Sequence, residues 1–482
     1  MTTLRPLLVL WLLSAALFAI QPVGSALLLM VSVLKYPQLY REVGHRVQTS
    51  DSIGRYGLAM GLLVFVLHWL MMPPAPADDL LRHIPAQAYG FVPSSIFPHS
   101  SLPSYSLYPA FEHGVGALAQ AWGPLVTVQV VMAAAWLSAI LLVIGLVRQS
   151  GAGISAGTSV LVCLLFSTAL SERLFLGRPE VFGVLWGCSA LLCQRRASVL
   201  AWIVGGVLFA SSYWLFPLYL VCVLLLPQSW KVRITAGAVL LTYHLAFWSW
   251  NAGELLTYIH ALELIPVWTK ARLMTVLETQ SIWLMFVRPP MVLLTALGLT
   301  GLMRMEPRQR AMLLAVGGAV LLTNMVRYAA VLALLLFFAA LPLVPALNAF
   351  VRKHLAAALV VLVLPVLTVG VVRQAAPTLD QLPRFELSVG AKVLTAFDSA
   401  TFALPFFNPG KVQIIPAMEV GATELPYQQA SYNLNAGKLT CKDLEGLDVS
   451  HVVERTQRNI PECLKLAKVQ GEWRLWEVAN GH

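Results

Sequence analysis

The chain has 482 residues, of which 58% are apolar and only 12% are charged. This composition, with a mean hydropathy of +0.73, excludes an ordinary water-soluble protein and predicts a membrane protein with many spans. The formal net charge of +10 does not indicate nucleic-acid binding, because the Lys and Arg residues fall mostly in short loops between apolar segments. In that position they act as topology signals.

Apolar stretches long enough to cross a bilayer recur along the chain, and we expect about 11–13 membrane-spanning helices, several of them short. The first apolar stretch follows Arg5 and has no convincing cleavage site, so we expect it to be retained. The remaining spans are expected near 56–72, 122–147, 154–170, 181–193, 199–211, 214–226, 234–250, 282–303, 311–324, 329–347 and 355–372. The predicted fold is mainly α, a polytopic transmembrane helical bundle.

The basic residues set the orientation of this bundle, because short cytoplasmic loops are rich in Lys and Arg. Clusters on one side include Arg148, Arg195-Arg196, Arg304 and Arg352-Lys353. The loops 73–116, 171–180 and 251–281 and the tail after Arg373 then share the outer face. We therefore expect a multi-pass protein of a bacterial inner (plasma) membrane, with a membrane domain at 1–373 and a periplasmic domain at 374–482.

The hydrophilic tail has the pattern of a small α/β domain. Strand-like and helical segments alternate at 392–397, 399–405 and 411–415, and further strands are expected at 450–453 and 473–478. Cys441 and Cys463 are the only cysteines of the tail. They predict a disulfide formed in an oxidising compartment, with two unpaired thiols as the alternative.

Several motif-based functions lose support. The sequence contains no Walker A motif, no GxGxxG after a strand, no HExxH and no paired CxxC. An ATP-driven pump, a dinucleotide enzyme and a zinc protease are therefore disfavoured. Chemistry, if present, must come from side chains of the outer face.

The first outer loop contains the richest set of candidates. Asp78 and Asp79 directly follow a predicted span, and Pro76 suits a helix start, so Asp78 and Arg82 would share a face at i,i+4, as would Asp79 and His83. The alternative is a solvated surface helix in which the acids only cap the N-terminus, because acidic side chains in a first turn interact favourably with the helix dipole. A cap needs only one acid, however, and the aromatic-rich loop continues to His99 and Glu112-His113. We favour a functional role for the pair.

Four further basic residues of the outer face are candidate phosphate ligands. They are Arg178, Lys270, Arg272 and Arg327. Guanidinium groups match phosphate oxygens in geometry and charge, although membrane-surface anchoring is an equally good explanation for Arg178. Lys270 and Arg272 lie in the segment 251–281, which has the pattern of an amphipathic interfacial helix or of a solvated connector.

The early acidic pair and the many spans followed by an outer domain resemble the GT-C superfamily of polytopic glycosyltransferases. The tail segment from Ala391 to Val412 is similar to the opening of the outer domain in some of these enzymes. The resemblance implies an enzyme that transfers a sugar from a polyprenyl-phosphate carrier to a lipid, glycan or protein acceptor. It also implies Asp78 or Asp79 as general base, Arg82, His83 and the four basic residues above as substrate or phosphate ligands, and no nucleic-acid partner.

Two questions stay open from the sequence. Basic side chains could suffice to stabilise the leaving phosphate without a cofactor, or Asp78 and Asp79 could bind a divalent cation such as Mg²⁺ or Mn²⁺. A transporter or flippase of lipid-linked saccharides is an alternative function, and a non-catalytic membrane assembly protein is another. A transporter predicts charges spread through the spans, whereas the predicted spans contain almost none. Arg327, in the gap between the spans at 311–324 and 329–347, is either a charge at membrane depth or, if a turn lies there, an interfacial residue.

Overall fold

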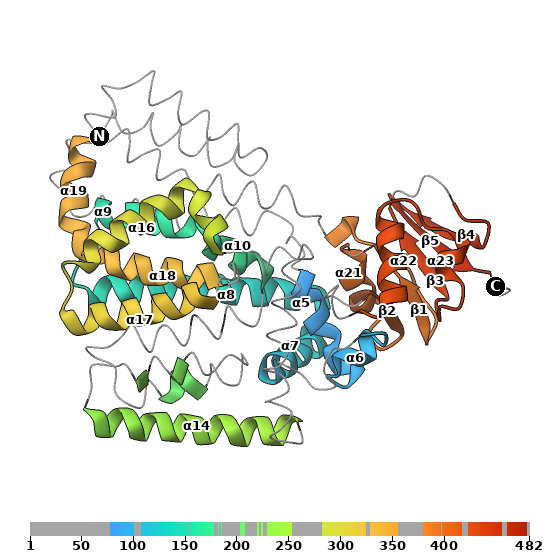
Figure 1. Cartoon of the computed structure of the whole chain (residues 1–482), viewed down its shortest axis with the longest axis horizontal. Coiled ribbons are helices and arrows are strands. Elements are labelled where there is room, and N and C mark those ends of the chain that lie inside the picture. Colours follow the sequence, from blue (N-terminus) through green and yellow to red (C-terminus); the bar gives the residue numbers. More distant parts are fainter. Residues whose placement is uncertain are drawn as a thin grey trace.

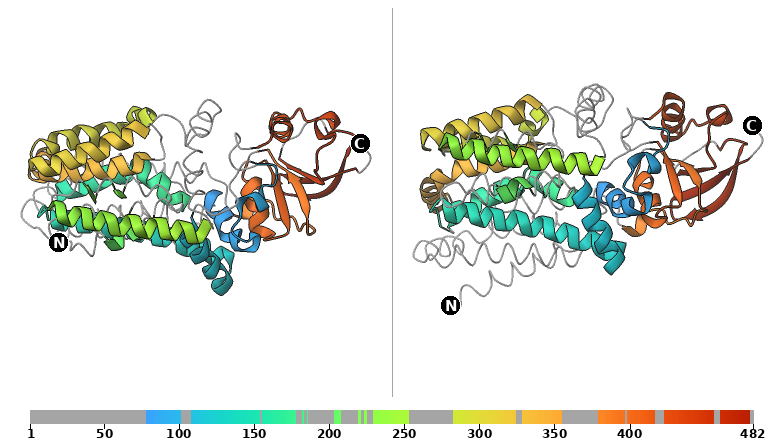
Figure 2. Two further views of the ribbon diagram at one scale, coloured as in Figure 1. Left: turned by 60° about the horizontal axis from the view of Figure 1, so that its bottom comes forward. Right: turned by 90° about the horizontal axis from the view of Figure 1, so that it is seen from below.

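The structure is a computed structural model of the chain. It describes residues 78–100, 108–153, 155–177, 203–207, 229–252, 282–323, 328–354, 379–396, 398–416, 423–455 and 460–479, with the single residues 182, 185, 219, 220, 223 and 224. Most of these residues are helical, and a small sheet forms near the C-terminus. Figure 1 and Figure 2 place the helical body and the sheet at opposite ends of the long axis.

The helical body contains eight of the described helices. They are α8 (Pro124–Gln149), α9 (Ala156–Phe166), α10 (Ala169–Leu176), α14 (Trp230–Ala252), α16 (Pro289–Leu302), α17 (Pro307–Thr323), α18 (Ala329–Ala340) and α19 (Val344–Lys353). Within the described ranges, two continuous helical stretches are long and apolar enough to cross a membrane, Pro124–Arg148 and Ala329–Lys353. The predicted spans near 56–72 and 355–372 lie outside the described residues, as does most of the region 181–226.

Two spans that the sequence predicts as continuous are interrupted. The stretch 154–170 breaks after α9. There the Ser167 hydroxyl donates to the Cys163 carbonyl at 2.6 Å, and the Thr168 hydroxyl donates to the Leu165 carbonyl at 2.6 Å. These bonds satisfy carbonyls that the broken helix would leave free. The stretch 282–303 divides into the 3-10 helix η4 (Ile282–Val287) and α16, because Pro289 takes the first helical position.

Close backbone contact holds α16 against α18. A Cβ atom at Gly301 would lie 2.1 Å from the carbonyl oxygen of Ala339, so only glycine fits at this crossing. Gly298, one turn earlier, faces Leu336 in the same way. Small residues at such crossings let helices of an apolar bundle approach each other closely.

The basic helix ends gather at one end of the helical body. α8 ends with Arg148, and the chain then enters α9, where the Gly157 N–H donates to the Asn348 side chain of α19 at 2.7 Å. α19 itself ends with Arg352-Lys353. Arg310 of α17 donates to three carbonyls at the end of α16 and just after it, those of Leu302, Met303 and Met305, each at 3.1 Å. This end is remote from the sheet (Figure 1).

The C-terminal region is an α/β domain of five strands in the order β2-β1-β3-β5-β4. The strands are β1 (Ala391–Leu394), β2 (Val412–Ile415), β3 (His451–Glu454), β4 (Leu464–Gln470) and β5 (Trp473–Val478). The first three are mutually parallel, and β4 and β5 form an antiparallel hairpin beside β3. The predicted strands at 392–397, 411–415, 450–453 and 473–478 are confirmed; β4 was not predicted.

Helices cover both faces of this sheet. One face carries α21 (Ala400–Phe407), which buries Ala400 and Leu404 against Val393 and Ile414. The other face carries α22 (Leu425–Asn435) and the short α23 (Cys441–Leu444). The predicted disulfide is present, and it joins Cys441 at the start of α23 to Cys463 beside β4.

The first outer loop and the C-terminal domain share their cores. The loop forms α5 (Asp78–His83), the 3-10 helix η1 (Ile84–Tyr89) and α6 (Pro93–Ile96), followed after residue 108 by α7 (Pro109–Trp122). Tyr89, Ile96 and Phe97 are buried in the core of the sheet. Conversely, Ala403 and Phe406 of α21 belong to the core of the helical body. The two predicted domains are therefore interlocked at this junction.

Candidate functional site

The helix α5 carries the acidic pair and is fixed from several sides. Its described residues run from Asp78 to His83, and it packs against α21, α7, η1 and α10. Leu80 and Leu81 are completely buried. These anchors hold the first turn, with Asp78 and Asp79, where the helical body meets the C-terminal domain. The side chains of the two acids lie outside the described residues.

The end of α10 lies directly against α5. Gly177 ends α10 in the left-handed conformation, with φ +58°, and a Cβ atom there would lie 3.0 Å from Leu80. The chain therefore passes beside α5 immediately before Arg178. Arg178 itself lies outside the described residues, and so do Lys270, Arg272 and Arg327.

The last turn of α5 contains a buried histidine paired with a carboxylate. His83 Nδ1 lies 2.6 Å from Oε1 of Glu112, which is on α7, and the side chains are 1% and 8% exposed. The rings of Tyr108 and Phe111 contact the imidazole edge-on, with centroids at 5.2 and 5.6 Å. Aromatic walls and burial keep this pair dry, which strengthens its hydrogen bond.

Arg82 fixes the proton on the His83 ring. Its Nη2 lies 3.1 Å from His83 Nε2, and a guanidinium can only donate. His83 Nε2 is therefore the acceptor, and Nδ1 carries the hydrogen that is donated to Glu112. The result is a polarised chain from Arg82 through His83 to Glu112. The second carboxylate oxygen of Glu112, Oε2, is buried and has no hydrogen-bond partner among the described residues.

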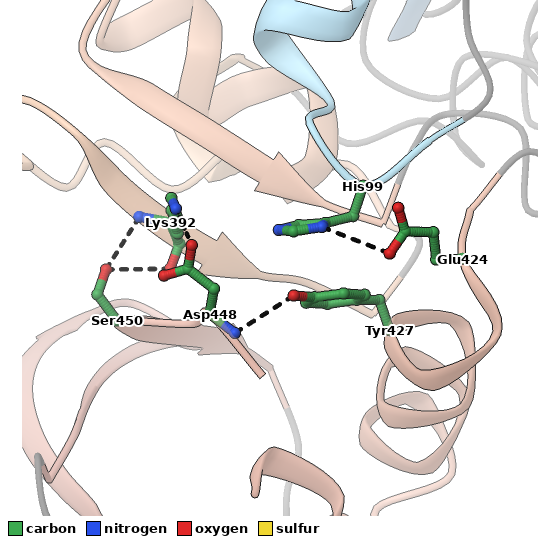
Figure 3. Close-up of polar contacts among 6 residues, drawn as sticks. All are labelled: His99, Lys392, Glu424, Tyr427, Asp448 and Ser450. Atoms are coloured by element: carbon green, nitrogen blue, oxygen red, sulfur yellow. Dashed lines mark hydrogen bonds and ion pairs between the residues drawn. The ribbon is translucent and has the colours of Figure 1, made fainter. Parts of the chain in front are cut away.

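A second polar cluster joins His99, in the middle of the first outer loop, to the C-terminal domain (Figure 3). The His99 ring stacks on Tyr427 of α22 with centroids 3.9 Å apart, and its Nδ1 lies 3.6 Å from Glu424 Oε2. The Asp448 N–H donates to the Tyr427 hydroxyl at 3.3 Å. Nearby, Asp448 forms an ion pair with Lys392. This cluster and the backbone bridge between Ser100 and Thr423 hold the loop in place.

The structure brings together part of the predicted site and adds one residue to it. Arg82 and His83 lie side by side, and Glu112 joins them. Glu112 was noted as a residue of the loop, but no role was predicted for it. Its partner His83 is 29 positions away, and the spacing of residues along one helix gives no sign of a contact between two helices. Among the described residues, no group of three or more metal-binding side chains occurs.

The interfacial helix expected at 251–281 lies outside the described residues, except that Asn251 and Ala252 end α14. Asn324 and Arg327 lie outside the described residues; α17 ends at Thr323, and α18 begins at Ala329. The chain matches no protein-family model, and no curated protein matches it at a significant level.

Proposed function

We propose that the protein is a glycosyltransferase that moves a sugar from a polyprenyl-phosphate carrier to an acceptor at the outer face of a bacterial inner membrane. The observation that carries this proposal is the placement of α5. Its first turn bears Asp78 and Asp79, its last turn bears Arg82 and the buried His83–Glu112 pair, and it is clamped between α7, α10 and α21. Acids and a guanidinium are thus presented on one short, rigid element.

This placement suits a transfer with inversion at the anomeric carbon. Asp78 or Asp79 takes the proton of the acceptor hydroxyl as its oxygen bonds to the anomeric carbon. The bond from that carbon to the phosphate oxygen breaks, and the lipid phosphate leaves with the electron pair. Arg82 is one helical turn from Asp78, where its charge would stabilise the departing phosphate. His83 and Glu112 act as positioning residues that hold Arg82.

The position of the candidate spans agrees with a lipid substrate. α7, which carries Glu112, leads through Gly123 directly into α8, whose stretch Pro124–Arg148 is long and apolar enough to cross a membrane. The site therefore lies near one end of a candidate span, where a lipid phosphate group would be found. The basic helix ends lie at the opposite end of the helical body, as the positive-inside rule requires for an outer-face site.

The test is turnover by the purified protein in liposomes that contain polyprenyl-phosphate sugars. We expect Asp78→Asn or Asp79→Asn to reduce release of the lipid phosphate at least about a hundredfold, the range for loss of a general base. Glu112→Gln should give a smaller loss in kcat, because the amide still fills the site but pairs poorly with His83. Asp380→Asn, which removes an acid that is 83% exposed in the C-terminal domain, is the matched control.

The alternatives predict different results in the same assay. Wild-type turnover in both aspartate variants would contradict the role of the acids. Movement of the saccharide lipid across the bilayer without release of phosphate would support a flippase, and neither activity would support an assembly protein. Loss of turnover with a chelator and its return with Mg²⁺ or Mn²⁺ would place a divalent cation at the acidic pair.

A further inference from the structure

The C-terminal sheet has a topological switch between β1 and β3. The chain leaves β1 through α21 on one face and returns in β2, on one side of β1. It then crosses through α22 and α23 on the other face and enters β3, on the opposite side of β1. In open sheets of this kind, ligands bind outside the carboxyl ends of the two strands that flank the switch.

Polar groups follow both strands at this point. Thr395 directly follows β1, and its hydroxyl lies 2.7 Å from that of Thr401 in α21. Asp398 follows three positions later, and its Oδ1 accepts the N–H of Ala400 at 3.0 Å. Glu454 ends β3 and is buried, and Arg455 follows it at the surface. Asp398 is partly exposed, so it and Arg455 are the groups that a ligand can reach.

The charges of this edge act on one another. Burial raises the pKa of Asp398 to about 6, Arg455 lowers it and Glu454 raises it. Arg455 already has a partner, since its Nη2 lies 2.6 Å from Glu472 and its guanidinium covers the Trp473 ring at 5.1 Å. Functional sites are enriched in acids perturbed by burial and a specific charge.

The helix α22 contacts the end of β1 and carries a buried amide one turn from that contact. The Ser431 hydroxyl donates to the carbonyl of Thr395, and Gln428 precedes Ser431 by one turn on the same helix face. Gln428 is 6% exposed, and its Nε2 has no hydrogen-bond partner among the described residues. Buried amides are rarely left in this state in a native protein.

We propose that this edge, where Asp398 and Arg455 lie beyond the buried Thr395, is a saccharide-binding site of the C-terminal domain. A phosphate or nucleotide is disfavoured, because Asp398 and Glu454 would repel it and the two nearby guanidinium groups already have acidic partners, Arg455 with Glu472 and Arg474 with Glu454. A neutral polyhydroxylated ligand suits the same groups, because its hydroxyls donate to a carboxylate and accept from a guanidinium. The role of this site rests on the proposed function, because a glycosyltransferase would use it to hold the sugar acceptor.

Ligand-observed saturation-transfer NMR on the full-length protein in lipid nanodiscs tests this site. The probes are glucose, galactose, mannose, N-acetylglucosamine and their methyl glycosides, with inorganic phosphate as the competing class. We expect at least one sugar to contact the wild type, and Asp398→Asn to reduce its affinity about tenfold, as for loss of a hydrogen bond to a charged group. Arg455→Gln should weaken the same sugar, and Asp380→Asn should not.

The design separates this site from the proposed transfer reaction. Asp79→Asn should leave the sugar contact unchanged, and Asp398→Asn should retain the fold because asparagine also caps a helix start. Saturation transfer that is equal in wild type and Asp398→Asn, or contact by no sugar in the panel, would overturn the site. Failure of turnover in liposomes with intact sugar contact would instead overturn only the proposed reaction.

Discussion

Asp398 is held in a site that opposes its ionisation. Asp398 lies between β1 and α21, and partial burial there raises the pKa of its carboxyl group from an ordinary value of 3.8 to about 6. The folded protein therefore binds this proton more tightly than the unfolded chain does. The stability that results is complete below about pH 4 and is lost as the pH rises through about 6.

Asp398→Asn should therefore stabilise the protein at pH 8 by about 2 kcal/mol, because the amide carries no charge to desolvate. At pH 4 the stabilities of the variant and the wild type should converge. Thermal unfolding of the purified protein at the two pH values measures the difference. Asp380→Asn, on an exposed acid, should give little change at either pH, and a destabilised Asp398→Asn at pH 8 would contradict the desolvation argument.

The residues of the α5 site show how far local sequence rules reach. Pro76 predicted a helix near the acidic pair, in which Asp78 and Arg82 would share a face, and the described residues from Asp78 to His83 are helical. Local rules could not predict that His83 is buried against Glu112 of another helix. That contact depends on how α5 and α7 pack, which the intervening loop and the C-terminal domain determine together.

The elements of the C-terminal domain differ in how visible they are in the sequence. β5 has an apolar side that is buried in the sheet, so its alternating pattern was recognisable. β4 is an edge strand with Lys465 and Lys468, and nearly all of its side chains are exposed, so no buried face marks it in the sequence. Lysines and the register shift near Leu466 are features that protect an edge strand from pairing with other chains.

The crossing of α16 and α18 allows an element-scale prediction. Gly301→Ala should destabilise the helical body by about 2 kcal/mol, because its Cβ would overlap the Ala339 carbonyl and force the helices apart. Thermal unfolding in detergent measures the loss. Gly318→Ala on α17 is the matched control: no atom lies within 4 Å of its Cβ position, and alanine favours a helix over glycine. Equal melting temperatures for the two variants would contradict the packing argument.

At the scale of the molecule, the junction links the two predicted domains through reciprocal burial. The Tyr89 hydroxyl of the first outer loop donates to the Val412 carbonyl of the sheet at 2.8 Å. In the opposite direction, Phe406 of α21 is buried in the core of the helical body. Composition predicted a membrane domain and a tail as separate units. It gave no sign of this exchange, because the apolar residues of a loop and those of a core look alike in a sequence.

The long axis carries a charge asymmetry that predicts how the protein lies in a membrane. Arg148, Arg304 and Lys353 mark one end of the helical body, and the sheet domain with its disulfide lies at the other (Figure 1). Short basic loops stay in the cytoplasm, and disulfides form in oxidising compartments. The sheet domain should therefore be periplasmic.

Labelling of single introduced cysteines in intact cells tests this orientation. Lys468→Cys on the exposed edge strand should react with a membrane-impermeant maleimide added outside, provided that the outer membrane is permeable to it. Arg304→Cys, also exposed, should react only after the inner membrane is opened. The unmodified protein provides the baseline for its six native cysteines, of which Cys441 and Cys463 are joined. Labelling of Arg304→Cys from outside together with protection of Lys468→Cys would reverse the orientation and exclude transfer at the outer face.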